Sequence, residues 1–234
     1  VKLFNKTFRE PARVAAFPDL WREGRTDALV VAETDVLPFD MGAHDLVIHS
    51  LGLHWANDPV GQLIQCRRAL RPDGMMLAVA LGGQTLQELR SVLAEAEVTV
   101  TGGLSPRVAP MGEVRDLGAL LQRAGFALPV AATVVLQVRY QTAWHLMRDL
   151  RAMGEGNALQ TRLRYPTPRA VLERAADLYA DSFAHPDGGI TATYELIVLT
   201  GWAPDDSQPK PLRPGSAQSR LADALRTDET SLPD

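Results

Sequence analysis

The sequence predicts an α/β domain with a mainly parallel sheet. Residues 44–83 alternate as strand, helix, turn and strand, which is the βαβ unit of a parallel sheet. Helical and strand patterns then alternate as far as residue 201. The length of 234 residues and the apolar content of 46% suffice for one domain with a sizeable core. We expect a single domain over residues 1–203 and an extended tail, rich in Pro, Ser, Asp and Gly, over 204–234.

Composition excludes several classes of protein. With a net charge of −4, the chain lacks the excess of positive charge that binds nucleic acid non-specifically. No apolar run approaches the roughly 20 residues that span a bilayer. Cys66 is the one cysteine, so no internal disulfide forms, and we expect a buried thiol in a reducing, cytoplasmic setting. Because the first residue is Val1, we also expect the natural N-terminus to be missing.

The first third of the chain carries the sheet's leading strands. We expect Val1–Glu10 to be the end of a helix that Pro11 breaks, followed by a strand over Ala12–Phe17. The β-branched run Ala28–Ala32 is the next predicted strand.

The central βαβ unit begins with the apolar strand Asp45–Ile48. Asn57 or Asp58 can cap the following helix, and Pro59 suits its first turn. Arg71–Gly74 has the composition of a tight turn that leads into the strand Met75–Leu81.

The remaining elements follow from periodicity. Gly125 is well placed to stop one of the helices. We expect helices over Thr85–Val98, Val114–Ala124, Trp144–Met153 and Pro168–Ser182, one or two strands over Phe126–Tyr140, and a last strand over Ile190–Gly201.

Five segments, in this order, resemble the methyltransferase-like assembly factors of respiratory complex I, within the class I S-adenosylmethionine (SAM) methyltransferases: Leu53–Gly74, Leu81–Arg90, Gly102–Val108, Met153–Ala158 and Gly201–Ala217. The resemblance implies a Rossmann-like fold with an antiparallel closing hairpin, and SAM as cofactor. It also implies a protein client, a complex I subunit, through which the chain would be membrane-peripheral. The related assembly factor is associated with arginine hydroxylation.

Two departures concern the SAM site. In the family the first strand leads into a glycine-rich loop, but this chain has Phe17 and Pro18 there and no glycine before Gly24. The connection from Trp21 to Ala28 is also too short for a complete βα unit. We therefore expect the second strand, which normally ends in the ribose-binding acid, to be absent or shortened.

By resemblance, the positions equivalent to the SAM site are Phe17, Asp19, Glu33 and Ser50. Because the glycine loop is missing, we expect this site to be degenerate and SAM to bind weakly or not at all.

His54 and Trp55 follow a strand at the carboxyl edge of the sheet, where α/β proteins bind ligands, and are the candidate catalytic residues. Alternatively, Trp55 packs under the loop and His54 bonds to backbone. His44 and His49 are expected at a turn and a strand end. Their spacing does not favour a metal site.

Asp58, Ser105, Arg107, Glu155 and Asn157 are the candidate substrate or partner residues. Carboxylates there would suit an arginine or peptide client. The alternative role is turn formation and helix capping. We expect His54, Trp55, Arg107, Glu155 and Asn157 to converge on one cleft, with the tail over 206–215 beside it. The alternative for the tail is a flexible linker.

Two functions stay open at this point. One is a SAM-binding transferase or protein-arginine-modifying enzyme. The other, which the missing glycine loop favours, is a non-catalytic methyltransferase-like protein, a pseudoenzyme that holds a client during assembly.

Overall fold

The computed structural model describes residues 2–3, 6–15, 19 and 28–209. Contacts divide the chain into two units, Val1–Pro204 and Asp205–Asp234. Of the second unit only residues 205–209 are described, and the Gln208 amide donates to the Asp205 carbonyl across a turn at 3.2 Å. The predicted extended tail and its position beside a cleft therefore stay predictions.

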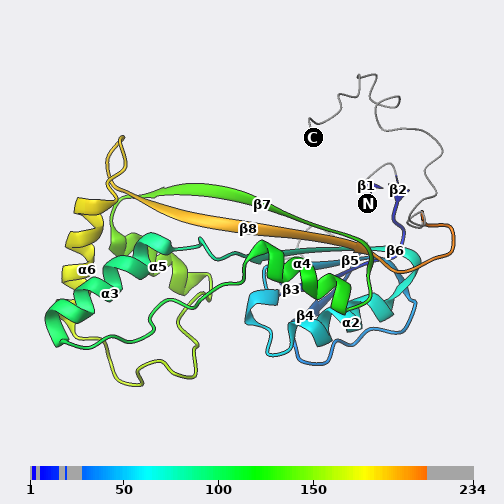
Figure 1. Ribbon diagram of the computed structural model, residues 1–234, viewed down its shortest axis with the longest axis horizontal. Helices are drawn as coiled ribbons and strands as arrows, with labels where there is room; N and C mark the ends of the chain where they lie inside the picture. Colours follow the sequence, from blue (N-terminus) through cyan, green and yellow to red (C-terminus); the bar gives the residue numbers. More distant parts are fainter. Residues whose placement is uncertain (1, 4–5, 16–18, 20–27, 210–234) are drawn as a thin grey trace, which may run out of the picture. The chain divides into compact units, whose positions relative to one another are not determined.

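The first unit is built on a six-stranded sheet with the order β4-β3-β5-β6-β8-β7 (Figure 1). The parallel strands are β3 (Pro11–Ala15), β4 (Leu29–Ala32), β5 (His44–Ser50) and β6 (Leu70–Leu81). The antiparallel pair at the other side is β7 (Ala127–Tyr140) and β8 (Ile190–Trp202). This confirms the Rossmann-like α/β fold with its closing hairpin.

The missing strand is also confirmed for the described residues. β4 pairs directly with β3, with Ala12 opposite Leu29 and Ala15 opposite Ala32, and no described strand lies between them. Phe17 and Pro18, at the junction that follows β3, lie outside the described residues.

The helices serve two separate cores. α2 (Pro59–Ala69) and α4 (Val114–Arg123) pack against the sheet around Leu63, Cys66 and Leu121. α3 (Gln87–Thr101), α5 (Ala143–Ala152) and α6 (Arg169–Ser182) pack together around Leu146 and Tyr179, at the far end of the β7–β8 hairpin (Figure 1).

Several local predictions are confirmed. The Asp58 carboxylate accepts from the Gly61 amide at 2.8 Å and caps α2, with Pro59 as its first residue. Gly125, with φ of +82°, follows the end of α4. Burial raises the pKa of Cys66 to about 12, as suits an inert thiol.

Two predictions were wrong. The first residues form no helix end. Instead β1 (Lys2–Leu3) and β2 (Lys6–Thr7) pair as antiparallel strands, because so short a helix end is marginal on its own and strand pairing satisfies the same backbone groups. The other error concerns Arg71–Gly74. Pairing jumps from Leu70 to Met75, so these residues bulge out within β6, with Asp73 at φ of +57°, rather than preceding it.

Candidate functional site

The carboxyl ends of the parallel strands meet at one edge of the sheet. Glu33 follows β4, and its amide donates to the Ala15 carbonyl of β3 at 3.1 Å. The short 3-10 helix η1 (Leu53–Trp55) follows β5 and presents His54 and Trp55. Parallel pairing therefore brings the acid and the histidine to the same edge.

A contact over a hundred residues of sequence joins this edge to the turn after α5. The His54 Nε2 atom lies 3.2 Å from the Glu155 Oε1 atom, and the Trp55 indole donates to the same oxygen at 3.3 Å. The side chains of His54 and Glu155 are only 3% and 14% exposed. One carboxylate thus fixes both candidate catalytic residues.

Glu33 joins this group through its electrostatics. Burial raises the pKa of the Glu33 carboxyl, nearby His54 lowers it, and Glu155 raises it again. A Cβ atom at Gly52 would lie 1.8 Å from the Glu33 Oε2 atom, so any other residue at this position would force the Glu33 carboxyl to move. We call Glu33, His54, Trp55 and Glu155 the edge cluster.

A second histidine lies behind the edge cluster. His49 is fully buried, its Nε2 atom lies 2.8 Å from the Gln62 Oε1 atom, and burial lowers its pKa. The Nδ1 atoms of His49 and His54 are buried and have no hydrogen-bond partner among the described residues. The described residues contain no group of three or more His, Cys, Asp or Glu arranged to hold a metal ion.

Ser105, Arg107 and Asn157 are tied to the protein itself. The Arg107 guanidinium donates to both carboxylate oxygens of Glu97, at 3.1 and 2.7 Å, and to the Thr167 hydroxyl at 2.6 Å. The Ser105 hydroxyl donates to Glu97 at 2.7 Å, and the Asn157 amide donates to the Pro106 carbonyl at 2.8 Å. These side chains therefore hold the 102–108 loop in place.

Sequence reasoning missed Glu97, the centre of that network. Burial raises the pKa of its carboxyl, but hydrogen bonds from Arg107 and Ser105 lower it more, and the net shift is downward. The position of Glu97 in the apolar pattern of the helix could have identified it. Glu97 follows Leu93 by four residues on the buried face of α3, where an unpaired charge would be costly.

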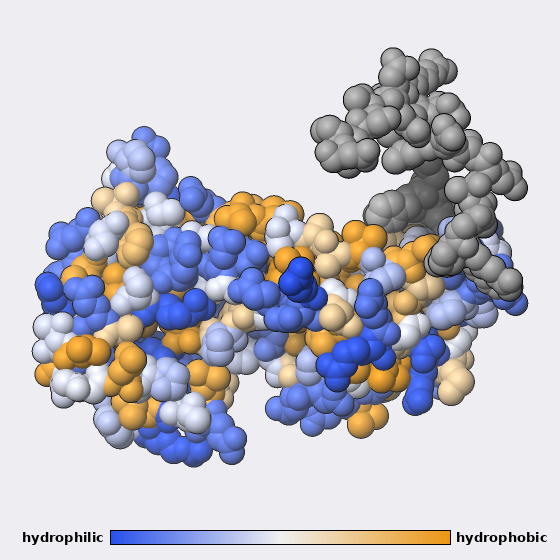
Figure 2. Space-filling model, in the orientation of Figure 1, coloured by the Kyte–Doolittle hydropathy of each residue, from blue (hydrophilic) through white to orange (hydrophobic). Residues whose placement is uncertain are grey.

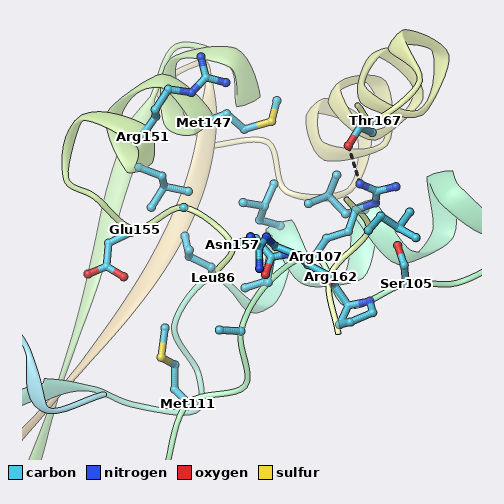
Figure 3. Close-up of a pocket in the computed structure, with 18 of the residues that line it drawn as sticks. Leu86, Ser105, Arg107, Met111, Met147, Arg151, Glu155, Asn157, Arg162 and Thr167 are labelled. Atoms are coloured by element: carbon cyan, nitrogen blue, oxygen red, sulfur yellow. Dashed lines mark hydrogen bonds between the residues drawn. The ribbon is translucent and has the colours of Figure 1, made fainter. Parts of the chain in front are cut away.

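Two cavities meet at the edge cluster, and Trp55, Leu81 and Glu155 line both. The smaller, about 430 Å³, also contacts Ser105, Arg107 and Asn157. In Figure 3, Glu155 lies well apart from the group formed by Arg107, Asn157 and Arg162 in this cavity. Four of the five predicted partner residues, Ser105, Arg107, Glu155 and Asn157, thus line one cavity but do not meet at one binding point.

The larger cavity, about 820 Å³, is mainly apolar. It is floored by side chains of β7 and β8, among them Leu136, Tyr140 and Tyr194, and it reaches Ser50 at the end of β5. The hydroxyls of Tyr140 and Tyr194 lie 3.4 Å apart, and burial raises the pKa of Tyr194. A polar edge and an apolar floor suit a ligand that carries both kinds of group.

The other predicted residues lie elsewhere. Asp19 is exposed, and Phe17 lies outside the described part of the chain. Asp58 uses its carboxylate to cap α2 and is not among the described lining residues of either cavity.

Comparison with known proteins agrees with this geometry. Residues 8–78 match the family described as Methyltransferase domain. Two solved structures share the fold with TM-scores of 0.51 and 12% identity, a putative methyltransferase from Bacillus halodurans and YcgJ from Bacillus subtilis. They cover 84% of this chain, which covers 93% and 92% of theirs.

Among curated proteins, the mitochondrial arginine-hydroxylase NDUFAF5 of Danio rerio is 40% identical over 194 residues, and that of Homo sapiens is 40% identical over 193 residues. Over residues 8–78 the chain thus matches a methyltransferase domain, and over about four fifths of its length it is similar to NDUFAF5. The alignments cover 83% and 80% of this chain but only 60% and 54% of those NDUFAF5 proteins.

A malonyl-[acyl-carrier protein] O-methyltransferase of Laribacter hongkongensis is 35% identical to this chain over 180 residues. The alignment covers 77% of this chain and 58% of that enzyme. Within the described residues, no helix combines the length and the apolar character needed to cross a membrane.

Proposed function

We propose that this NDUFAF5 homologue is a non-catalytic protein-interaction factor whose SAM site is degenerate. The observation that carries the proposal is the direct pairing of β3 with β4. A strand between them would normally end in the acid that binds the ribose of SAM. Here the acid that directly follows β4 is Glu33, whose carboxyl is packed against Gly52 and interacts electrostatically with His54 and Glu155.

The sequence supports the same proposal, because no glycine precedes Gly24. Without a glycine in the eight residues after β3, backbone amides there would not be free to approach the carboxylate and ribose of the cofactor. The residues at hand thus make an incomplete set for SAM.

The retained edge cluster and the cavities beside it support a protein client. By resemblance that client is a subunit of respiratory complex I. Trp55 and Glu155 line both cavities, so a bound segment that fills either one would contact them.

Titration of the purified chain with SAM by calorimetry tests the proposal. Each lost hydrogen bond to a charged group is worth about 1.5–3 kcal/mol, so two or three losses weaken binding on the order of a thousandfold. We expect no heat at micromolar SAM. Micromolar affinity for SAM would refute the degenerate site.

Client recovery tests the interaction. Trp55→Phe and Glu155→Gln should lower recovery of complex I subunits from a lysate. Trp144→Phe is the matched control, because Trp144 is 45% exposed on α5 and is not among the described residues lining either cavity. Equal recovery with all three folded variants would place the client elsewhere.

One observation favours the alternative, an active methyl-transferring or arginine-modifying enzyme. The His54 imidazole is held by the Glu155 carboxylate at the ligand-binding edge, and its Nδ1 atom has no described partner. SAM-dependent labelling of a client, lost in His54→Gln, would support the enzyme and overturn the non-catalytic proposal.

A further inference from the structure

The outer side of β7 is unpaired within the described part of the chain. β7 is the last strand of the sheet order and pairs only with β8 among the described strands (Figure 1). It has 14 residues, which at about 3.3 Å per residue is a length of roughly 46 Å. A long free edge offers a row of backbone donors and acceptors to another strand.

The central part of this edge lacks the features that normally prevent such pairing. No charged residue occurs from Ala127 to Val138, and both Pro129 and the irregular pairing lie at the start of the strand. All residues over 132–137 are exposed, although their side chains alternate between the two faces. Val134, Val135 and Leu136 are 46%, 49% and 44% exposed.

Figure 2 shows an apolar patch on the surface above the middle of β7. Soluble proteins usually protect such an edge with lysine, proline or a bulge. The absence of all three over this stretch indicates that the edge has a partner.

The chemistry of the edge defines that partner as an extended, uncharged and apolar strand. β7 itself meets this description. In an antiparallel pair centred within residues 132–137, the Arg139 side chain of each copy falls opposite the start of the other β7, so the two arginines do not face each other. Self-pairing therefore meets no like-charge repulsion along the strand.

We propose that a second copy of this chain binds along β7, antiparallel about a two-fold axis within residues 132–137, and joins the two six-stranded sheets into one. The proposal does not rest on the proposed function, since neither the SAM site nor the edge cluster takes part, although Leu136 of this stretch also lines the larger cavity. A strand pair alone buries less than the roughly 800 Å² per partner of a standard interface, so we expect dissociation on the order of micromolar.

Sedimentation velocity over a wide range of concentration tests the proposal. The wild-type chain should change from monomer to dimer, whereas Val135→Lys and Val135→Glu should each weaken dimerisation at least tenfold by placing like charges at the axis. Mixing the two variants should restore the dimer, which shows that both remain folded. Val98→Lys, at a valine 51% exposed on α3, is the control and should dimerise as the wild type does.

Four results would overturn the proposal. The wild-type chain could stay monomeric at every concentration, or Val135→Lys could dimerise as well as Val98→Lys. An open-ended series of larger assemblies would exclude a closed two-fold pair, as would a mixture of Val135→Lys and Val135→Glu that stays monomeric.

Discussion

At the scale of single residues, this protein assigns its charged side chains to two different tasks. Glu97 accepts from Ser105 and Arg107 within one covered network. Glu155 instead accepts from His54 and Trp55 where two cavities meet. Arg107 is already satisfied by Glu97 and Thr167 and therefore holds the structure together, whereas the proposed role of the edge cluster is recognition.

Glu97→Gln should destabilise the protein by about 3–5 kcal/mol, because the largely buried Arg107 loses its carboxylate. The pKa of Glu97 is lowered from its ordinary value of 4.5, so its stabilising contribution is complete above that pH and is lost as the pH falls through the lower, folded-state pKa. The difference in the free energy of unfolding between wild type and variant should stay constant near neutral pH and become smaller in acid. Urea unfolding at several pH values measures it.

The control is Glu173→Gln on the exposed Arg169–Glu173 pair of α6. It should leave the unfolding midpoint almost unchanged, because water already screens that pair. If both substitutions had the same effect, the Glu97 network would contribute no more than a surface ion pair.

At the scale of elements, the β7–β8 hairpin depends on two consecutive glycines just before β8. Gly188 and Gly189 have φ of +85° and +83°. A Cβ atom at Gly188 would meet nothing within 4 Å, whereas one at Gly189 would lie 2.2 Å from the Tyr140 carbonyl oxygen. The two positions share a left-handed backbone conformation and differ in the room that a Cβ atom would have.

Gly188→Ala should therefore cost about 1–2 kcal/mol, the price of a left-handed conformation. Gly189→Ala should cost about 3 kcal/mol or more, because backbone must also move. Thermal unfolding of the pair measures the difference. Equal losses would mean that the hairpin adjusts freely around Tyr140.

Periodicity predicted most elements, since apolar stripes such as Leu89, Leu93 and Ala96 are local patterns that burial makes visible. Arg71–Gly74 was misread because turn residues do not reveal whether pairing resumes on the same strand. The contact between His54 and Glu155 spans 101 positions of sequence, and no local pattern predicts a hydrogen bond between the imidazole and this particular carboxylate. Resemblance suggested their proximity, and the fold supplied the geometry.

At the scale of the whole first unit, the β7–β8 hairpin connects two cores that share few side chains. Ile197 and Leu199 belong to the sheet core, while Ile190 and Ala192 of the same strand belong to the core of α3, α5 and α6. Separate cores behave as separate units of local unfolding.

Leu146→Ala and Leu121→Ala test this division, because each leucine is fully buried in a different core. Each should cost about 2–5 kcal/mol. In native-state hydrogen exchange, Leu146→Ala should speed the exchange of backbone amides in α3, α5 and α6, while amides of β3 and β5 stay protected. Leu121→Ala should have the opposite effect. Equal release everywhere would mean one cooperative unit.

The direct contact between β3 and β4 has a consequence for how such domains lose parts. In a parallel ladder each strand presents the same spacing of amides and carbonyls, so any strand of suitable length can replace a lost neighbour. After excision of one strand and its helix, the flanking strands can rejoin with a regular register, as Val14 and Val31 do. The rejoined ladder then keeps its regular backbone pairing over the described strands, so the scaffold can persist after such a deletion.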